Sequence, residues 1–432
     1  MNSNHANSLP QPHGASQYYN LFVLSILGFV SFFNYMDRAL FAILAQDIKQ
    51  DIVLTDTQLG LLGGFGFALF YAIMGLPLAR LADTRPRVTL LSVCVGLWSL
   101  ATALCGLASN FTQMFLARTL VGIGESGGTP TSYSIISDYF PKQRRAFAIG
   151  LFHAGGNLGV MFGLILAGVV ADAYGWQMAF VALGLPGVLL ALIIKGWLQE
   201  PPRGRFFDAD TRHAVGHIDV RAAVQRLLRR PTYIHLMLGF SIGFFAYYGL
   251  LHWTPAFFIR AHGMSTSETG MFFGLAFGSG GVLGMTVGAL LAPLLIRRDR
   301  RWEMWIVAGS FALSIPFYAI AFLLASTHIA MAFIFLAGLT VTAGTAPGLA
   351  AIQSVAEPNV RALATAIQFF VGALIGQGMG PFFVGAMSDA LMPRYGGADG
   401  LRYALLLSLG AFAWGAAHLV LAARNFHRDR VD

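Results

Sequence analysis

Two of the long apolar stretches in this sequence carry charged residues. Asp37 and Arg38 are neighbours in the first stretch, and Arg118 and Glu125 lie two helical turns apart in the fourth. A charge inside hydrocarbon is costly unless it is paired or faces water, so such residues are functional by default. Burial favours the neutral form of an acid, whereas neighbouring arginines favour its charged form. We therefore expect these four residues to form a proton-coupling cluster beside a substrate cavity; the alternative for Asp37 and Arg38 is an interfacial pair.

Seven further side chains within apolar stretches are candidates for lining the same cavity: Asn34, His153, Asn157, Tyr247, Tyr248, His252 and Gln368. His153 and Asn157 are four residues apart and so share a helical face. A packed, hydrogen-bonded histidine explains His153 about as well as a proton carrier does. An aromatic belt at the membrane surface is the alternative for the two tyrosines and His252.

The composition excludes a soluble globular protein. Of the 432 residues, 56% are hydrophobic and 11% are charged, whereas soluble domains carry about 25% charged residues. The 50 glycines suit a membrane protein, because small residues let membrane helices approach closely. The two cysteines, Cys94 and Cys105, would be roughly 16 Å apart along one helix, too far for a disulfide. We expect neither a metal nor a cofactor.

The apolar stretches predict an all-α polytopic membrane protein with twelve spans. Each is long enough to cross about 30 Å of hydrocarbon. The predicted spans are 20–46, 58–82, 87–108, 111–138, 145–171, 176–198, 232–259, 267–295, 302–325, 329–356, 361–390 and 400–423.

A polar connection in the middle divides these spans six and six. We expect a disordered tail (1–19), an N-terminal bundle (20–198), a linker (199–230), a C-terminal bundle (231–424) and a second tail (425–432). Within the linker, apolar residues at helical spacing alternate with arginines, which predicts an amphipathic helix on the cytoplasmic leaflet; a solvated linker is the alternative.

The basic residues predict the orientation. With both termini cytoplasmic, 22 of the lysines and arginines lie on the inside and 4 on the outside. Basic residues are enriched on the cytoplasmic side of membrane proteins. We therefore expect an integral protein of the bacterial inner membrane, with both termini and the linker in the cytoplasm.

The two halves also resemble each other in sequence. Corresponding positions at an offset of 216 or 217 hold the same residues, namely Arg145 and Arg361, Gly159 and Gly376, Gly163 and Gly380, and Asp172 and Asp389. A parallel repeat of six plus six spans resembles the architecture of a major facilitator transporter, in which the substrate binds between the halves at the midplane.

The connection between the second and third predicted spans resembles the major facilitator signature, with Asp83 and Arg87 at the matching positions and Ala79 and Pro86 in place of glycines. The resemblance implies a charge-pair latch at the cytoplasmic mouth; ordinary enrichment of basic residues on the inside is the alternative. We expect the cytoplasmic gate to consist of Asp83, Arg87, Arg145, Glu357 and Arg361.

Four segments resemble bacterial members of the Spinster branch of the major facilitator superfamily: Asp37-Arg38, residues 54–60, Arg118 with residues 122–125, and residues 138–141. The resemblance implies a proton-coupled transporter of sphingolipid-type or lysophospholipid substrates, with Asp37, Arg38 and Glu125 as coupling residues. The run 126–130 departs from the Spinster pattern. The string 34–38 also occurs in organic-anion symporters of the same superfamily, so a proton-coupled symporter of small organic anions is the alternative.

These features predict a secondary transporter that works by alternating access, and not an enzyme. We expect its partners to be an amphipathic or anionic substrate, protons and membrane lipid, with no nucleic acid, and we expect a monomer. A membrane-embedded enzyme would need a nucleophile, paired acids or a metal motif within the spans, and we find none. A channel would need rings of pore charges, which the sequence lacks.

Overall fold

The computed structural model describes residues 17–206, 220–357 and 360–429, and these contain helices but no strand. In chain order, the elements of the first half are α1 (Gln17–Asp51), α2 (Asp56–Gly60), the π-helical η1 (Leu61–Phe65), α3 (Gly66–Thr84), α4 (Arg87–Cys105), α5 (Phe111–Ser126), α6 (Gly128–Tyr139), α7 (Lys142–Tyr174) and α8 (Trp176–Trp197). Those that follow are α10 (Val220–Leu228), α11 (Pro231–His262), α12 (Thr266–Ile296), α13 (Trp302–Leu323), α14 (Thr327–Ala343), α15 (Thr345–Ser354), α16 (Arg361–Gly372), the π-helical η2 (Ala373–Met379), α17 (Gly380–Ser408) and α18 (Gly410–Asp429).

The twelve predicted membrane crossings are present. Ten segments of the described chain are long and apolar enough to span a membrane. The last of them, Leu363–Phe426, changes direction at Gly396, whose φ is 82°, and therefore holds two crossings. The predicted span 111–138 is a further crossing, formed by α5 and α6 on either side of Gly127.

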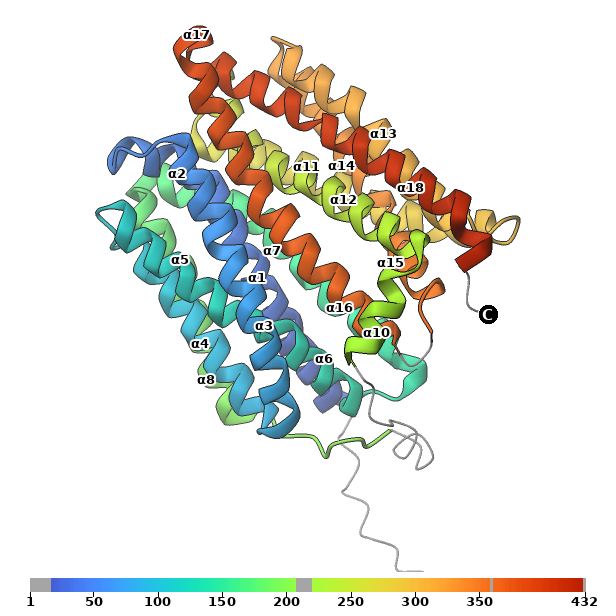
Figure 1. Ribbon diagram of the computed structural model, residues 1–432. Helices are drawn as coiled ribbons and strands as arrows, with labels where there is room; N and C mark the ends of the chain where they lie inside the picture. Colours follow the sequence, from blue (N-terminus) through green and yellow to red (C-terminus); the bar gives the residue numbers. More distant parts are fainter. Residues whose placement is uncertain (1–16, 207–219, 358–359, 430–432) are drawn as a thin grey trace, which may run out of the picture.

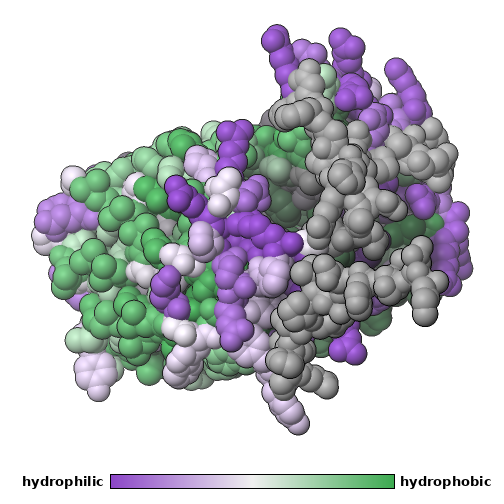
Figure 2. Space-filling view, turned by 90° about the horizontal axis from the view of Figure 1, so that it is seen from below, coloured by the Kyte–Doolittle hydropathy of each residue, from purple (hydrophilic) through white to green (hydrophobic). Residues whose placement is uncertain are grey.

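The helices form two bundles, one from α1 to α8 and one from α11 to α18 (Figure 1). Tyr19 binds Gln199 and Asp429 binds Thr232, so both ends of the described chain lie beside the ends of the linker. We call this the linker end and the opposite end, which carries Asp56, the far end. Seen from the linker end, hydrophilic side chains gather in the middle of the view, beside a left flank that is mostly hydrophobic, as expected where a membrane protein leaves the bilayer (Figure 2).

The internal repeat in the sequence corresponds to equivalent packing in the two bundles. A side chain at Gly159 would overlap the backbone oxygen of Phe32 in α1, and one at Gly376 would come within 2.6 Å of Phe244 in α11. The repeated glycines therefore let α7 and η2 approach the first helix of their own bundle. The pseudo-symmetric arrangement that the sequence predicts is confirmed.

The structure corrects three details of the predicted organisation. Helix α1 begins at Gln17 and α18 continues to Asp429, so parts of the two expected tails are helical, while residues 1–16 lie outside the described chain. The amphipathic helix is present as α10. Its apolar residues Ala223 and Leu227 are buried in the protein core, however, so this face does not lie on the lipid leaflet.

Candidate substrate and proton site

The centre of the N-terminal bundle holds a buried ion pair. Arg38 on α1 donates from Nε to Oε2 of Glu125 on α5 over 2.8 Å. Glu125 is fully buried, whereas 18% of the Arg38 side chain is exposed. The Arg38 guanidinium also lies 5.0–5.3 Å from the ring centroids of Tyr35, Phe67 and Tyr71. The pair thus combines a charge-assisted hydrogen bond with cation–π contacts, which desolvation strengthens.

Asp37, the neighbour of Arg38, faces a different helix. Its Oδ2 accepts a hydrogen bond of 3.0 Å from Thr102 on α4, and its Oδ1 has no hydrogen-bond partner among the described residues. Asp37 as a whole is 1% exposed. Asp37 therefore lies in the expected region but forms no ion pair there with either arginine.

Arg118 on α5 is a buried cation that has no acidic hydrogen-bond partner among the described residues. It is 2% exposed, and its Nε and Nη1 find no partner in the described part of the chain. Its guanidinium lies 4.8 Å from the ring centroid of Phe41 and 5.2 Å from that of Phe67. That both arginines act on Glu125 stays a prediction; Arg38 is hydrogen-bonded to Glu125, and the Phe67 ring contacts both guanidinium groups.

A predicted residue of the C-terminal bundle, His252, contacts an aromatic ring of this cluster. His252 on α11 stacks on Phe41 with ring centroids 5.8 Å apart and an interplanar angle of 18°. The imidazole is buried, and its Nε2 has no hydrogen-bond partner among the residues described. Phe41 thus contacts both Arg118 and His252, so it connects the charged cluster of one bundle to the other bundle.

Of the remaining predicted cavity residues, Asn34 interacts with Glu125 and Tyr248 with Arg38, and several make further contacts. His153 Nε2 lies 2.6 Å from the Tyr133 hydroxyl, Asn157 lies 3.7 Å from the Met285 sulfur of the other bundle, and Gln368 lies 3.5 Å from the Ser241 hydroxyl. Tyr247 and Tyr248 pack edge-to-face against each other. Asn34 is buried, and its Nδ2 lacks a hydrogen-bond partner within the described residues.

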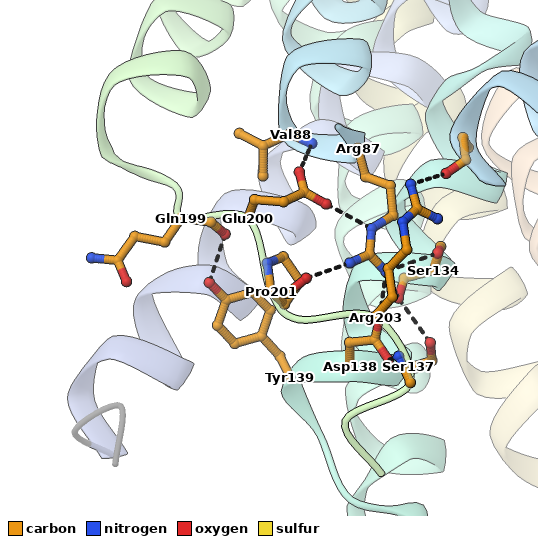
Figure 3. A network of polar contacts seen from close by, with 12 residues as sticks. Arg87, Val88, Ser134, Ser137, Asp138, Tyr139, Gln199, Glu200, Pro201 and Arg203 are labelled. Atoms are coloured by element: carbon orange, nitrogen blue, oxygen red, sulfur yellow. Dashed lines mark hydrogen bonds and ion pairs between the residues drawn. The ribbon is translucent and has the colours of Figure 1, made fainter. Parts of the chain in front are cut away.

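At the linker end, Arg87 binds groups other than Asp83 (Figure 3). Its buried guanidinium forms an ion pair with Asp138 on α6, and Nε donates to Glu200 at 2.8 Å. Nη2 donates to the Pro201 oxygen at 2.6 Å. The first residues of the linker are thereby fixed to the N-terminal bundle.

The other expected gate residues make the following contacts with described residues, and their role as a gate stays a prediction. Asp83 is exposed and forms no ion pair among the described residues. Arg145 donates to the Ser137 oxygen within its own bundle. In the C-terminal bundle, Glu357 pairs with Arg226 and Arg230, and Arg361 donates to the Ala356 oxygen.

The sequence reasoning missed a polar network at the far end. Asp56 is fully buried and accepts two hydrogen bonds of 2.7 Å from Arg260, which belongs to the other bundle. Lys49 and Ser388 each bind the same carboxylate at 2.6 Å. The sequence places Asp56 in a short polar connection and Arg260 near the end of a span, and neither position signals that the two meet.

Comparisons with known proteins agree with this architecture. The sequence model of the Major Facilitator Superfamily matches residues 27–381. The chain is 35% identical to an MFS-type efflux pump of Mycolicibacterium smegmatis, over 95% of this chain and 94% of the relative. It is 27% identical to the sphingosine-1-phosphate transporter SPNS2 of Danio rerio, over 95% of this chain and 85% of the relative.

A solved structure supports the same relationship. The crystal structure of a bacterial homologue of the human lysosomal transporter Spinster, in an inward-facing and unoccupied conformation, superposes with a TM-score of 0.88. The two are 30% identical, and the match covers 96% of this chain and 99% of the other. The chain belongs to the major facilitator superfamily. It is an integral membrane transporter related to the Spinster proteins, and not an enzyme.

Proposed function

We propose that this transporter moves an amphipathic lipid with an anionic head group, of the lysophospholipid or sphingolipid type, and couples its movement to protons. The observation that carries the proposal is the buried Arg38–Glu125 pair beside Arg118, a cation to which no acid of the described chain is hydrogen-bonded. The similarity of this chain to a sphingosine-1-phosphate transporter supports the proposed substrate class. An anionic head group would meet the two guanidinium groups, and the surrounding aromatic rings suit an apolar tail.

The ion pair also provides a route for coupling. Glu125 is fully buried, and an unpaired carboxylate there would be expensive. When Glu125 takes up a proton, it releases Arg38, which then becomes available to the anionic head group. Proton binding and substrate binding would therefore favour each other, and by linkage each would raise the affinity for the other.

We further propose that the linker end faces the cytoplasm and that the structure is open to that side. The enrichment of basic residues supports this orientation. Hydrogen bonds between the bundles concentrate at the far end, around Asp56, Asp172 and Asp389. At the linker end, Arg87 and Glu357 bind partners on their own side of the molecule. Alternating access would close this end and open the far end.

Uptake into proteoliposomes with an imposed pH gradient tests the coupling. Glu125→Gln imitates the protonated acid, so it should bind substrate but lose accumulation driven by the gradient. Glu268→Gln is the matched control, because Glu268 is an exposed residue of a helix-capping box, a role that glutamine also fills. Full gradient-driven accumulation by Glu125→Gln would refute coupling through this residue.

Thermal unfolding of the purified protein with a panel of candidate ligands tests the substrate class. A ligand at about 100 times its Kd stabilises the folded state by about 2.7 kcal/mol. Lysophospholipids and sphingosine phosphates should raise the unfolding midpoint, and Arg118→Gln should reduce that effect. Stabilisation by small organic anions but not by lipids would favour the organic-anion symporter instead.

A further inference from the structure

Two acids related by the internal repeat make the same kind of contact at the far end. Asp389 on α17 accepts hydrogen bonds from the backbone N–H groups of Asp56 (3.0 Å) and Thr57 (2.7 Å), at the start of α2. Asp172 on α7 accepts a hydrogen bond of 2.9 Å from the backbone N–H of Ser267, at the start of α12. Each acid thus binds the first turn of a helix that belongs to the opposite bundle.

The two helix starts are built alike and leave the same donors free. The first four N–H groups of a helix have no partner within that helix. At α2, Thr55 and Gln58 form a capping box, and at α12 Ser265 and Glu268 do the same. In both cases the box satisfies the N–H of the third helical residue and of the capping residue. The donors that remain in the first turn include those that the acid of the other bundle accepts.

The two contacts have different polar surroundings. Beside the first, the Thr57 hydroxyl donates to Asp389 at 2.6 Å, and Asp56 binds Arg260 and Lys49 as ion pairs. Beside the second, the Thr266 hydroxyl donates to Asp47 at 3.0 Å. Neither Asp47 nor Asp172 has an ion-pair partner among the described residues.

We propose that these two contacts, in each of which an acid of one bundle caps a helix of the other, hold the far end closed; we call them the crossed caps. Asp172 and Asp389 are then positioning residues that set the equilibrium between the state in which the far end is closed and the state in which it is open. When the bundles part at the far end, each acid must leave its helix start, and the exposed N–H groups must find water. This inference rests on the alternating-access part of the proposed function, but not on proton coupling or on a lipid substrate.

The test measures how often the far end opens. Gln46 is 9% exposed and binds Arg260 of the other bundle at 2.6 Å, so a cysteine at position 46 should react with a water-soluble thiol reagent only in the open state. The native Cys94 and Cys105 are both buried. When opening and closing are fast, the reaction rate is proportional to the open population.

In a Gln46→Cys background, Asp172→Ala should raise the labelling rate about fivefold, the typical effect of losing a helix cap. Asp389→Ala removes three hydrogen bonds and should raise it about tenfold. The double variant should approach the product of the two. Asp51→Ala is the control, since Asp51 binds Trp176 at 3.0 Å within the N-terminal bundle and should leave the rate unchanged.

Spin labels separate opening of the bundles from local unfolding. Leu107 and Ala325 are exposed on far-end connections of the two bundles, and the distance between labels there should lengthen in the double alanine variant. If that variant does not fold, Asp172→Asn and Asp389→Asn replace it, with smaller shifts in the same direction. Unchanged labelling rates, or an equal increase with Asp51→Ala, would overturn the crossed caps. Neither result depends on substrate or on a pH gradient, so the Glu125→Gln test of the proposed function would be unaffected.

Discussion

The network around Arg87 predicts how a single amide substitution weakens the linker end. All three guanidinium nitrogens of Arg87 donate, with Asp138 and Glu200 as the charged acceptors. Asp138 also accepts a hydrogen bond of 3.0 Å from the Gly204 N–H, so it joins α6 to both α4 and the linker. Asp138→Asn removes one of the two negative charges that balance a cation of 1% exposure, without changing the size of the side chain.

The cost of this substitution follows from what remains around Arg87. Removing the only partner of a buried charge costs about 3–5 kcal/mol. Glu200 continues to bind Arg87 at 2.8 Å, so Asp138→Asn should cost about half of that, roughly 2 kcal/mol. The Glu200 side chain is 35% exposed and screened by water, so Glu200→Gln should cost only about 1 kcal/mol.

Equilibrium unfolding of the purified protein in mixed micelles measures both changes. Asp399→Asn is the matched control, because its ion pair with Arg402 is 44% exposed on the acid side and such pairs contribute about 0–1 kcal/mol. In an Arg87→Met background, the cost of Asp138→Asn should nearly vanish. An equal cost in both backgrounds would show that the ion pair is not what Asp138 contributes.

The same network has a pH dependence with a definite sign. Burial raises the pKa of the Glu200 carboxyl group, but hydrogen bonds from the Val88 N–H and from Arg87 outweigh it and lower the pKa below its usual range. The resulting stability is present above the unfolded-state pKa, about 4.3, and is lost as the pH falls through the lower folded-state value. The free energy of unfolding should therefore fall more steeply below about pH 4 in the wild type than in Glu200→Gln; parallel curves would refute this.

Three further predictions concern the conformational cycle and the orientation. A side chain at Gly63 would overlap the His252 ring. Gly63→Ala should therefore lower the free energy of unfolding by about 1 kcal/mol, because it displaces the His252 ring from its stack on Phe41. In a His252→Ala background, Gly63→Ala should leave the free energy of unfolding unchanged. Asp83→Asn should slow turnover but leave the equilibrium affinity for substrate unchanged, and a large loss of affinity with normal turnover would refute a gating role. Val53 and Arg85 are exposed at the far end and the linker end; with intact cells, an impermeant thiol reagent should label Val53→Cys but not Arg85→Cys, and the reverse pattern would invert the topology.

Sequence patterns predict the membrane-spanning helices of this protein well, because each span must be long and apolar enough to cross the bilayer by itself. Apolar length and the number of crossings are local properties, and the twelve crossings were readable from them. The repeat of Gly159 at Gly376 likewise predicts equivalent packing, since both glycines allow a close approach of two helices.

The partners of the charged residues were less predictable, because they depend on how helices are rotated against one another. Asp37 and Arg38 are adjacent in the sequence, yet one faces Thr102 on α4 and the other faces Glu125 on α5. Arg118 shares a helical face with Glu125 but lies against aromatic rings. Phe67 contacts both Arg38 and Arg118 but lies on a third helix, α3, so no spacing in the sequence indicates these contacts.

The contacts at the far end are repeated in both bundles, whereas the charged cluster at the centre belongs to one bundle. This difference limits how the two bundles can influence each other. The far-end caps from Asp172 and Asp389 repeat in both bundles, so each bundle holds the other closed in the same way. The charged cluster of Asp37, Arg38, Arg118 and Glu125 belongs to the N-terminal bundle. An event at those charges, such as proton uptake, must therefore reach the C-terminal bundle through contacts between the two. The stack of Phe41 between Arg118 and His252 is a direct contact of this kind.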